Sequence, residues 1–185
     1  GNLFIADQNN NRIQKWASGA ISGTTIINNL NNFYPSDIYV DDNGAIYVCD
    51  QPNHQILKFS LESSVGLVVA GGKNAGNDSN QLSNPQKIFV DKIGNIYIAD
   101  HENHRIQKWT PGATAGLTVA GGNGQGGAAN QLSYPRSVTV DVSGDIYIAH
   151  SDMIKKWEPS ATEGTNVLWV QDAMDISIDA NGFLY

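Results

Sequence analysis

The sequence is poor in several features that would mark a particular class of protein. It has a single cysteine, Cys49, among 185 residues, so no internal disulfide can form. Lys and Arg total 11 against 18 Asp and Glu, and the resulting charge of −7 disfavours nucleic acid as a partner. No apolar run is long enough to span a membrane, and no long window has helical periodicity. These absences exclude a disulfide-stapled scaffold and a helical protein.

One unit of strand, short polar loop and strand recurs along the whole chain. Its clearest copy is Gly94–Trp109, in which Ile96–Ala99 and Arg105–Trp109 are rich in β-branched and aromatic residues. The residues between these two segments are too polar for anything but a connection. The repeat units begin near Gly1, Gly44, Gly94 and Gly144, and a fifth begins at Gly182. Because the chain starts inside a repeat, we expect any targeting signal to lie outside it, and no compartment is assigned.

The period of these units predicts the fold. The turn glycines are 43, 50, 50 and 38 residues apart, a range typical of one propeller blade. Strands such as Ile96–Ala99 are apolar on both faces, which suits a sheet packed between two neighbours better than a layer of a sandwich. We therefore predict an all-β protein, a β-propeller of four-stranded antiparallel blades. Around Gly94 the four strand candidates are Lys87–Asp91, Ile96–Ala99, Arg105–Trp109 and Leu117–Ala120.

The repeat unit resembles the NHL repeat. The resemblance rests on Pro-x-x-Ile/Val-x-Val-Asp-x-x-Gly-Asn-Ile-Tyr-Ile-Ala-Asp followed by Asn-His-Arg-Ile, and it covers residues 1–185 as one propeller domain. The family implies a ring that is usually six-bladed, so we expect about four blades here as a section of a longer array, flanked by further blades. Three copies depart from the pattern. Asn11 replaces the His, Gln55 replaces the Arg, and in the last copy His150 replaces the Asp, in a shorter loop.

Two sets of loops should meet on one face of such a propeller. The loop between the second and third strands of a blade lies on the same face as the loop that leads into the next blade. His54, Glu102 and His104 belong to the first set, and the long segments Gly71–Pro85 and Gly121–Pro135 to the second. The long loops make this face asymmetric, and asymmetry on a repeating scaffold is where ligand choice would lie. We predict the two histidines and the glutamate as binding residues on this rim.

The residues just before the innermost strands should face the central channel. Blade by blade, they are Ser36-Asp37, Gln86-Lys87, Arg136-Ser137 and Met174-Asp175. Their charge differs between blades, as is expected of recognition residues and of unconstrained surface alike. The residues predicted to bind here are Asp37, Lys87, Arg136, Ser137 and Asp175, with surface divergence as the alternative.

Two further sets of repeated residues are assigned to structure. The first set is charged: Asp7, Asp50 and Asp100, with Arg12 and Arg105. Each of these carboxylates is expected to accept loop amides and, where the arginine is present, to pair with it. Residues repeated in three blades are rarely catalytic in each, so no catalytic residue is assigned. The second set is aromatic, occupies one repeat position and is predicted to pack blade against blade: Trp16, Phe59, Trp109 and Trp157.

No metal or cofactor is predicted from the sequence. An amidating lyase with this fold uses histidine-bound zinc, but His54 and His104 occupy equivalent positions in adjacent blades, too far apart to share one ion. His101 and His104 are a close pair within one loop, without a further ligand at metal-site spacing. The Gly-rich stretch Gly121–Gly127 lacks the Lys-Ser/Thr and the following helix of a phosphate loop.

These observations favour a non-catalytic binding scaffold whose top face recognises a protein or peptide partner. Related propellers are the recognition ends of tripartite-motif ubiquitin ligases, so the resemblance implies a ubiquitin-ligase-like role. The alternative is a metal-dependent enzyme of the lyase or lactonase type, for which Asp37 and Asp175 are the available ligands in the channel. A second alternative is RNA binding through Lys87 and Arg136, against which the acidic total weighs.

Overall fold

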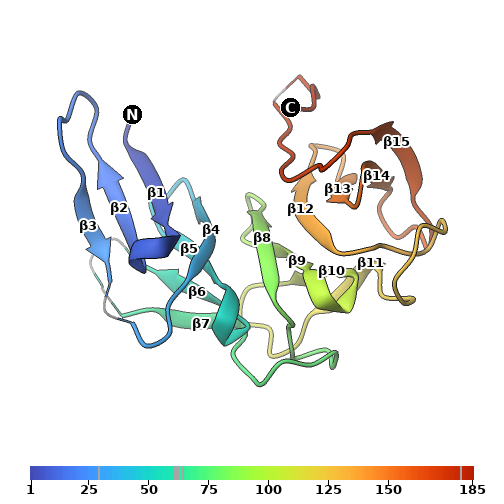
Figure 1. Ribbon diagram of the computed structural model, residues 1–185, viewed down its shortest axis with the longest axis horizontal. Helices are drawn as coiled ribbons and strands as arrows, with labels where there is room; N and C mark the ends of the chain where they lie inside the picture. The colour runs from blue at the N-terminus through green and yellow to red at the C-terminus, as the bar shows by residue number, and fades with distance from the viewer. Residues whose placement is uncertain (29, 61–62, 64, 180) are drawn as a thin grey trace.

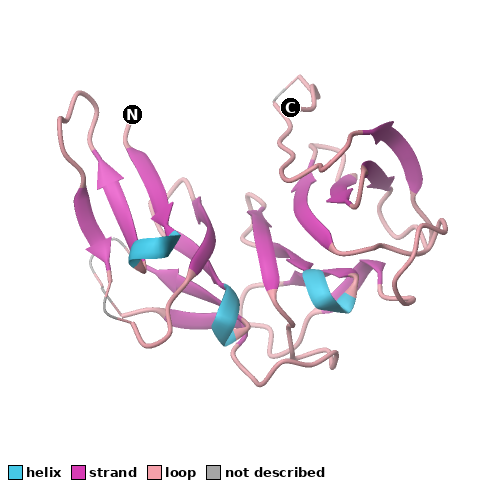
Figure 2. Ribbon diagram, viewed as in Figure 1, coloured by secondary structure: helices cyan, strands magenta, loops and turns pink. Residues whose placement is uncertain are grey.

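The computed structural model describes residues 1–28, 30–60, 63, 65–179 and 181–185. In these residues it contains fifteen β-strands and three short 3₁₀ helices (Figures 1 and 2). The helices form the connection between the second and third strands of a blade: η1 (Gln8–Asn10), η2 (Gln51–Asn53) and η3 (His101–Asn103). None of the described helices has the length and apolar character needed to cross a membrane. The all-β prediction is therefore confirmed.

The strands form four antiparallel sheets that follow one another along the chain. The first sheet contains β1 (Leu3–Asp7), β2 (Arg12–Trp16) and β3 (Thr24–Ile27). The second contains β4 (Pro35–Val40), β5 (Ile46–Asp50), β6 (Gln55–Phe59) and β7 (Leu67–Gly71). The third contains β8 (Pro85–Val90), β9 (Ile96–Asp100), β10 (Arg105–Trp109) and β11 (Leu117–Gly121). The fourth contains β12 (Pro135–Val140), β13 (Ile146–His150), β14 (Met153–Trp157) and β15 (Thr165–Trp169).

The sheets are blades of a propeller. Figure 1 shows them side by side along an arc, with β4, β8 and β12 turned toward its centre. β4 packs beside β8, and β8 packs beside β12, so the innermost strands of neighbouring blades are in contact. The first sheet has three strands because its β1 corresponds to the second strand of the other blades. The prediction of a propeller with four blades is confirmed, and a six-bladed ring stays a prediction.

An aspartate and a glycine build the turn between the first and second strands of a blade. The carboxylate of Asp41 accepts the backbone N–H of Asn43 at 3.0 Å and of Ala45 at 2.9 Å. Gly44 has a φ of +79°, in the left-handed region that glycine adopts without a Cβ penalty. The same hydrogen bonds recur around Asp91, Asp141 and Asp179. This geometry explains why the Val-Asp-x-x-Gly pattern repeats in the sequence.

A glycine faces the repeated aromatic residue of every blade. An added Cβ at Gly116 would collide with the indole of Trp109, which is 3% exposed and belongs to the apolar cluster between the second and third sheets. Because the φ of Gly116 is not positive, space rather than backbone conformation requires the glycine here. The other pairs of this kind are Gly23 with Trp16, Gly66 with Phe59 and Gly164 with Trp157.

The two long interblade loops are anchored in the core. Each contains a leucine, Leu82 or Leu132, that is fully buried in the apolar cluster of the blade interface. The backbone N–H of Gly116 donates to the carbonyl of Ser79 at 2.8 Å, which joins the first loop to the outer edge of the third blade. The loops therefore lie on the blades as ordered segments, at the end of the sheet where the inner strands begin.

We expect Gly116→Ala to lower the free energy of unfolding by about 1–3 kcal/mol, because the new methyl group must displace the indole of a well-packed core. Chemical denaturation of the two proteins measures the difference. Gly127→Ala is the matched control, since its Cβ would meet nothing within 4 Å and its φ is not positive. Equal stability of the two variants would contradict the assigned packing.

Candidate active site

The inner strands place one residue each at the same backbone position near the centre of the arc. Asp37, Lys87 and Ser137 are the third residues of β4, β8 and β12, and Asp175 follows β15 at the equivalent place. The strand pairing is irregular at this point in each of the three strands. Such irregularities re-aim a side chain. The observed β8 begins at Pro85, two residues before the predicted start at Lys87.

The four side chains at this position are in contact with one another. Lys87 Nζ lies 2.6 Å from Asp175 Oδ2 and 3.8 Å from Asp37 Oδ1. Ser137 Oγ donates a hydrogen bond of 2.8 Å to the other oxygen of Asp175. We call Asp37, Lys87, Ser137 and Asp175 the channel cluster. It joins residues that are far apart in the sequence and come from four successive inner-strand positions.

Backbone hydrogen bonds hold the channel cluster in place. Asp37 Oδ2 accepts the N–H of Ile88 at 2.9 Å, and so ties β4 to the next inner strand. The N–H of Ile176 donates to Ser137 Oγ at 3.2 Å and to Asp175 Oδ1 at 2.9 Å. Each acidic side chain thus has one oxygen fixed by a backbone N–H and the other directed to Lys87, and in Asp175 the backbone-bound oxygen also accepts from Ser137.

The two carboxyl groups of the cluster differ in their acidity. Burial raises the pKa of Asp37 to about 6, although the Lys87 ammonium and the N–H groups of Ile88 and Ile38 oppose the rise. Asp175 is also penalised by burial, but its hydrogen bonds from Lys87 and Ser137 outweigh that effect and lower its pKa. Two carboxyl groups with separated pKa values near an ammonium can act as an acid–base pair.

Arg136, the remaining predicted channel residue, lies at the edge of the cluster. Its Nη1 atom is 2.8 Å from Sδ of Met174, whose side chain is largely exposed. Lys87, the other basic residue predicted for RNA binding, is engaged by two carboxylates. A phosphate would have to compete with these carboxylates, so the structure gives Lys87 no role as a free phosphate contact.

The predicted rim residues bind loops rather than the channel cluster. His54 and His104 have left-handed backbones, with φ of 51° and 52°. His54 Nδ1 accepts the N–H of Asn84 at 3.1 Å, and His104 Nδ1 accepts that of Tyr134 at 3.2 Å. The backbone N–H of Glu102 donates to the carbonyl of Ser83. The two imidazoles and the backbone N–H of Glu102 position the residues that enter β8 and β12.

The repeated aspartates anchor the same interblade loops. Arg105 Nε donates to Asp100 Oδ2 at 2.7 Å, and its other nitrogens reach the carbonyls of residues 77, 78 and 81. Asp100 Oδ1 accepts the N–H of Ser83 at 2.7 Å. Asp7 pairs with Arg12 at 2.7 Å, and Asp50 accepts from the side chain of Gln55 at 2.8 Å. These contacts tie the repeated aspartates to the loops and to the residue five positions further along the chain.

In the fourth blade a different residue, which was not predicted from the sequence, donates to the carbonyls of the long loop. Lys155 is 1% exposed, and its Nζ donates to the carbonyls of Ala128 at 2.7 Å and Gln131 at 2.9 Å. Strand pairing aligns Lys155 with Gln107, two positions beyond Arg105 and on the same face of the strand. The signal in the sequence was the missing arginine together with the shorter loop, which moves the cation along the strand.

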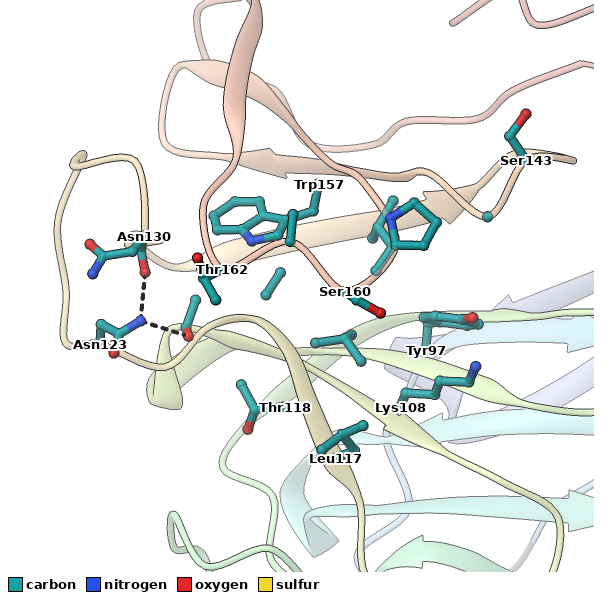
Figure 3. Close-up of a pocket in the computed structure, with 17 residues that line it drawn as sticks. Tyr97, Lys108, Leu117, Thr118, Asn123, Asn130, Ser143, Trp157, Ser160 and Thr162 are labelled. Carbon is teal, nitrogen blue, oxygen red and sulfur yellow. Dashed lines mark hydrogen bonds between the residues drawn. The ribbon is translucent and has the colours of Figure 1, made fainter.

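Besides the cluster, a groove of about 800 Å³ runs between the third and fourth blades. Figure 3 shows Tyr97, Lys108 and Leu117 on one side and Trp157 on the other, with Asn123 bonded to the carbonyl of Asn130. A comparable groove lies between the second and third blades. Because the groove repeats with the blades, it follows from their stacking.

The residues of the channel cluster do not fit a divalent metal. Among the described residues, no three His, Cys, Asp or Glu side chains are grouped so as to hold an ion. The cluster offers two carboxylates, Asp37 and Asp175, and the ammonium of Lys87 lies between them. A cation there would face a like charge where it needs a ligand.

Comparison with known proteins identifies the class first: solved structures similar to this one are β-propellers. A gluconolactonase from Xanthomonas campestris matches with a TM-score of 0.79 and 13% identity, over 99% of this chain and 64% of that one. Virginiamycin B lyase from Staphylococcus aureus matches with a TM-score of 0.68 and 13% identity, over 100% and 58%. An auxiliary nutrient binding protein from Bacteroides thetaiotaomicron matches at 0.64 and 18%, over 80% and 42%. The chain therefore spans less than two thirds of the length of these proteins.

The NHL-repeat family model matches residues 34–59 and 82–109, which contain β4 to β6 and β8 to β10. The chain therefore contains NHL repeats at these two positions on a β-propeller fold, as its repeat pattern predicts. A search of curated protein sequences finds no match.

These neighbours correct the functional prediction. The sequence favoured a non-catalytic scaffold, but the gluconolactonase and the lyase are enzymes on the same fold over almost the entire length of this chain. The prediction of a non-catalytic scaffold is therefore not kept. The comparisons do not support a ubiquitin-ligase-like role. The error arose because acid and base groups that come singly from different blades leave no local motif.

Titration of His150 should destabilise the fourth blade in mild acid. His150 is 1% exposed, its Nδ1 accepts the N–H of Ser133 at 3.2 Å, and burial together with the Lys155 charge lowers its pKa to about 4. The folded protein resists a proton that the unfolded chain accepts near pH 6.5. The stability that depends on neutral His150 is therefore complete above that pH and is lost as the pH falls toward 4.

His150→Asn keeps an acceptor for Ser133 and removes the titration. We expect the melting temperature of the wild-type protein to fall more than that of the variant when the pH is lowered from about 7 to about 5. Identical pH dependence of the two proteins would show that His150 does not contribute.

Proposed function

We propose that this chain is part of a lactonase-type propeller enzyme whose chemistry takes place at the channel cluster. The observation that carries the proposal is the carboxyl group of Asp37, with a pKa of about 6, held beside the ammonium of Lys87 where successive inner strands meet. Active sites need groups that titrate close to the working pH, and Asp37 meets that requirement. The likeness to a gluconolactonase supports the same reaction class.

Hydrolysis of a lactone needs a base that activates water and a positive group that stabilises the oxygen of the opening ester. Asp37 in its ionised form is placed to accept a proton from water, since one of its oxygens is occupied by the N–H of Ile88 and the other is directed to the channel side. Lys87 is placed to donate to the oxygen that gains negative charge. Asp175 holds Lys87 in position, and Ser137 donates to the other oxygen of Asp175.

A lyase is the second candidate, because the structure of virginiamycin B lyase covers the whole chain. In such a reaction Asp37 would remove a proton from carbon instead of water, while Lys87 would keep its role. Protein or peptide partners of the rim loops stay a prediction from the sequence.

The test is an assay of the protein with gluconolactone and related sugar lactones, and with virginiamycin B. We expect turnover of one of these substrates, with kcat/KM rising through about pH 6 as Asp37 loses its proton. Asp37→Asn should lower kcat by about 10²–10⁴-fold, the usual contribution of a general base. Asp42→Asn, which makes the same charge change at an exposed turn, should leave the rate unchanged.

No turnover of any of these substrates by the folded wild-type protein would contradict the proposed function. Full activity of Asp37→Asn would contradict the role of that carboxylate.

A further inference from the structure

We propose that the ammonium of Lys87 is the resident cation of the channel, occupying the place between Asp37 and Asp175 that a divalent metal would need, so that the site works without a metal. This inference deepens the proposed function and rests on it for its catalytic meaning. Its structural part, the identity of the cation, can be tested without any substrate.

The geometry is that of a cation held by opposed ligands. Lys87 Nζ lies 2.6 Å from one oxygen of Asp175 and 3.8 Å from one oxygen of Asp37, and it comes from the strand between those two in sequence. An ammonium has three N–H donors in a tetrahedral arrangement. The contact with Asp175 is a hydrogen bond and that with Asp37 is an ion pair beyond hydrogen-bond distance, so at least one donor is left for a ligand. The side chain of Lys87 is 30% exposed, so the remaining N–H can be reached from the channel.

Comparison of the repeats shows that Lys87 differs in chemistry from the residues at the equivalent position of the other repeats. The same backbone position carries oxygen-bearing side chains in the other described blades, namely Asp37, Ser137 and Asp175. An oxygen ligand at position 87 would complete a set of four around the channel. Lys87 instead places an ammonium at this position. The carboxylate oxygens of Asp37 and Asp175 are therefore already in contact with a cation.

The charges of the cluster favour the ammonium over an added ion. With both carboxylates ionised, the cluster has a charge of −1 when Lys87 is protonated, and a divalent ion would have to approach an ammonium bound to its own ligands. Ser137 strengthens this arrangement, since it donates to Asp175 and orients that carboxylate toward Lys87. The ligand that fits the free N–H is a carbonyl or ester oxygen, or the oxyanion that forms from it.

The test measures metal binding by calorimetry and by thermal shift, on protein that has been treated with a chelator. We expect the wild-type protein to show neither saturable binding of Mn²⁺ or Zn²⁺ nor stabilisation by these ions. Lys87→Met frees both carboxylates, and its affinity for Mn²⁺ should rise about tenfold or more because a like charge has left the site. Asp37→Asn in the Lys87→Met background should remove that gain.

Lys92→Met is the matched control, because it removes the same charge from an exposed turn of the same blade and should gain no affinity. Lys87→Gln, with a neutral polar side chain, serves as a second variant if Lys87→Met unfolds, which circular dichroism detects.

Stoichiometric metal binding by the wild-type protein that is lost in Asp37→Asn and Asp175→Asn would overturn the proposal. Absence of any gain in both folded Lys87 variants would overturn it as well, since the position would then not be one that a cation occupies. A wild-type protein that binds no metal and opens no lactone would contradict the proposed function alone.

Discussion

The blade sheets of this chain must be covered on both faces, and this constraint governs the rest of the structure. Every residue of β5 and of β9 is buried, although alternate side chains of a strand point to opposite faces. A sheet of this kind is stable only between two neighbours, so the blades stack side by side and their innermost strands come together. The aromatic residue of each third strand fills the space between blades, and a glycine without a side chain makes room for it.

The same constraint creates the candidate site. Because the inner strands converge, residues at one repeated backbone position face a common centre even when they are as far apart in the sequence as Lys87 and Asp175. The repeat supplies the positions, and the differences between copies supply the chemistry. A carboxylate, an ammonium, a hydroxyl and a second carboxylate at four equivalent positions produce a cluster that none of the copies contains by itself. The backbone N–H groups of Ile88 and Ile176 orient it.

Much of the fold could be predicted from the sequence because it depends on local patterns. The strand β10 has the predicted bounds, Arg105–Trp109, and the Asp-x-x-Gly turns follow from the needs of one backbone geometry. The contact between Gly116 and the indole of Trp109 could not be predicted, since it depends on the three-dimensional packing of the side chain against the neighbouring backbone. Lys155 was missed because the loop before it is shorter. The cation that donates to the carbonyls of the long loop therefore comes from a position further along the strand.

The candidate site was only partly predictable. Alignment of the repeats predicted that Asp37, Lys87, Arg136, Ser137 and Asp175 face the channel. In the structure Lys87 contacts Asp37 and Asp175, Ser137 contacts Asp175, and Arg136 contacts Met174 instead. Their contacts, and the raised pKa of Asp37, depend on burial and on distances across blades, which no linear spacing encodes. The sequence placed Asp37 and Asp175 in the channel as possible metal ligands, but it did not show that Lys87 lies between them.

The most direct test of this account is a crystal structure of the protein soaked in Mn²⁺, with anomalous scattering recorded. The account predicts Lys87 Nζ in contact with Asp175 and near Asp37, and no anomalous peak between the two carboxylates. A manganese ion bound by Asp37 and Asp175, with Lys87 displaced from them, would contradict it.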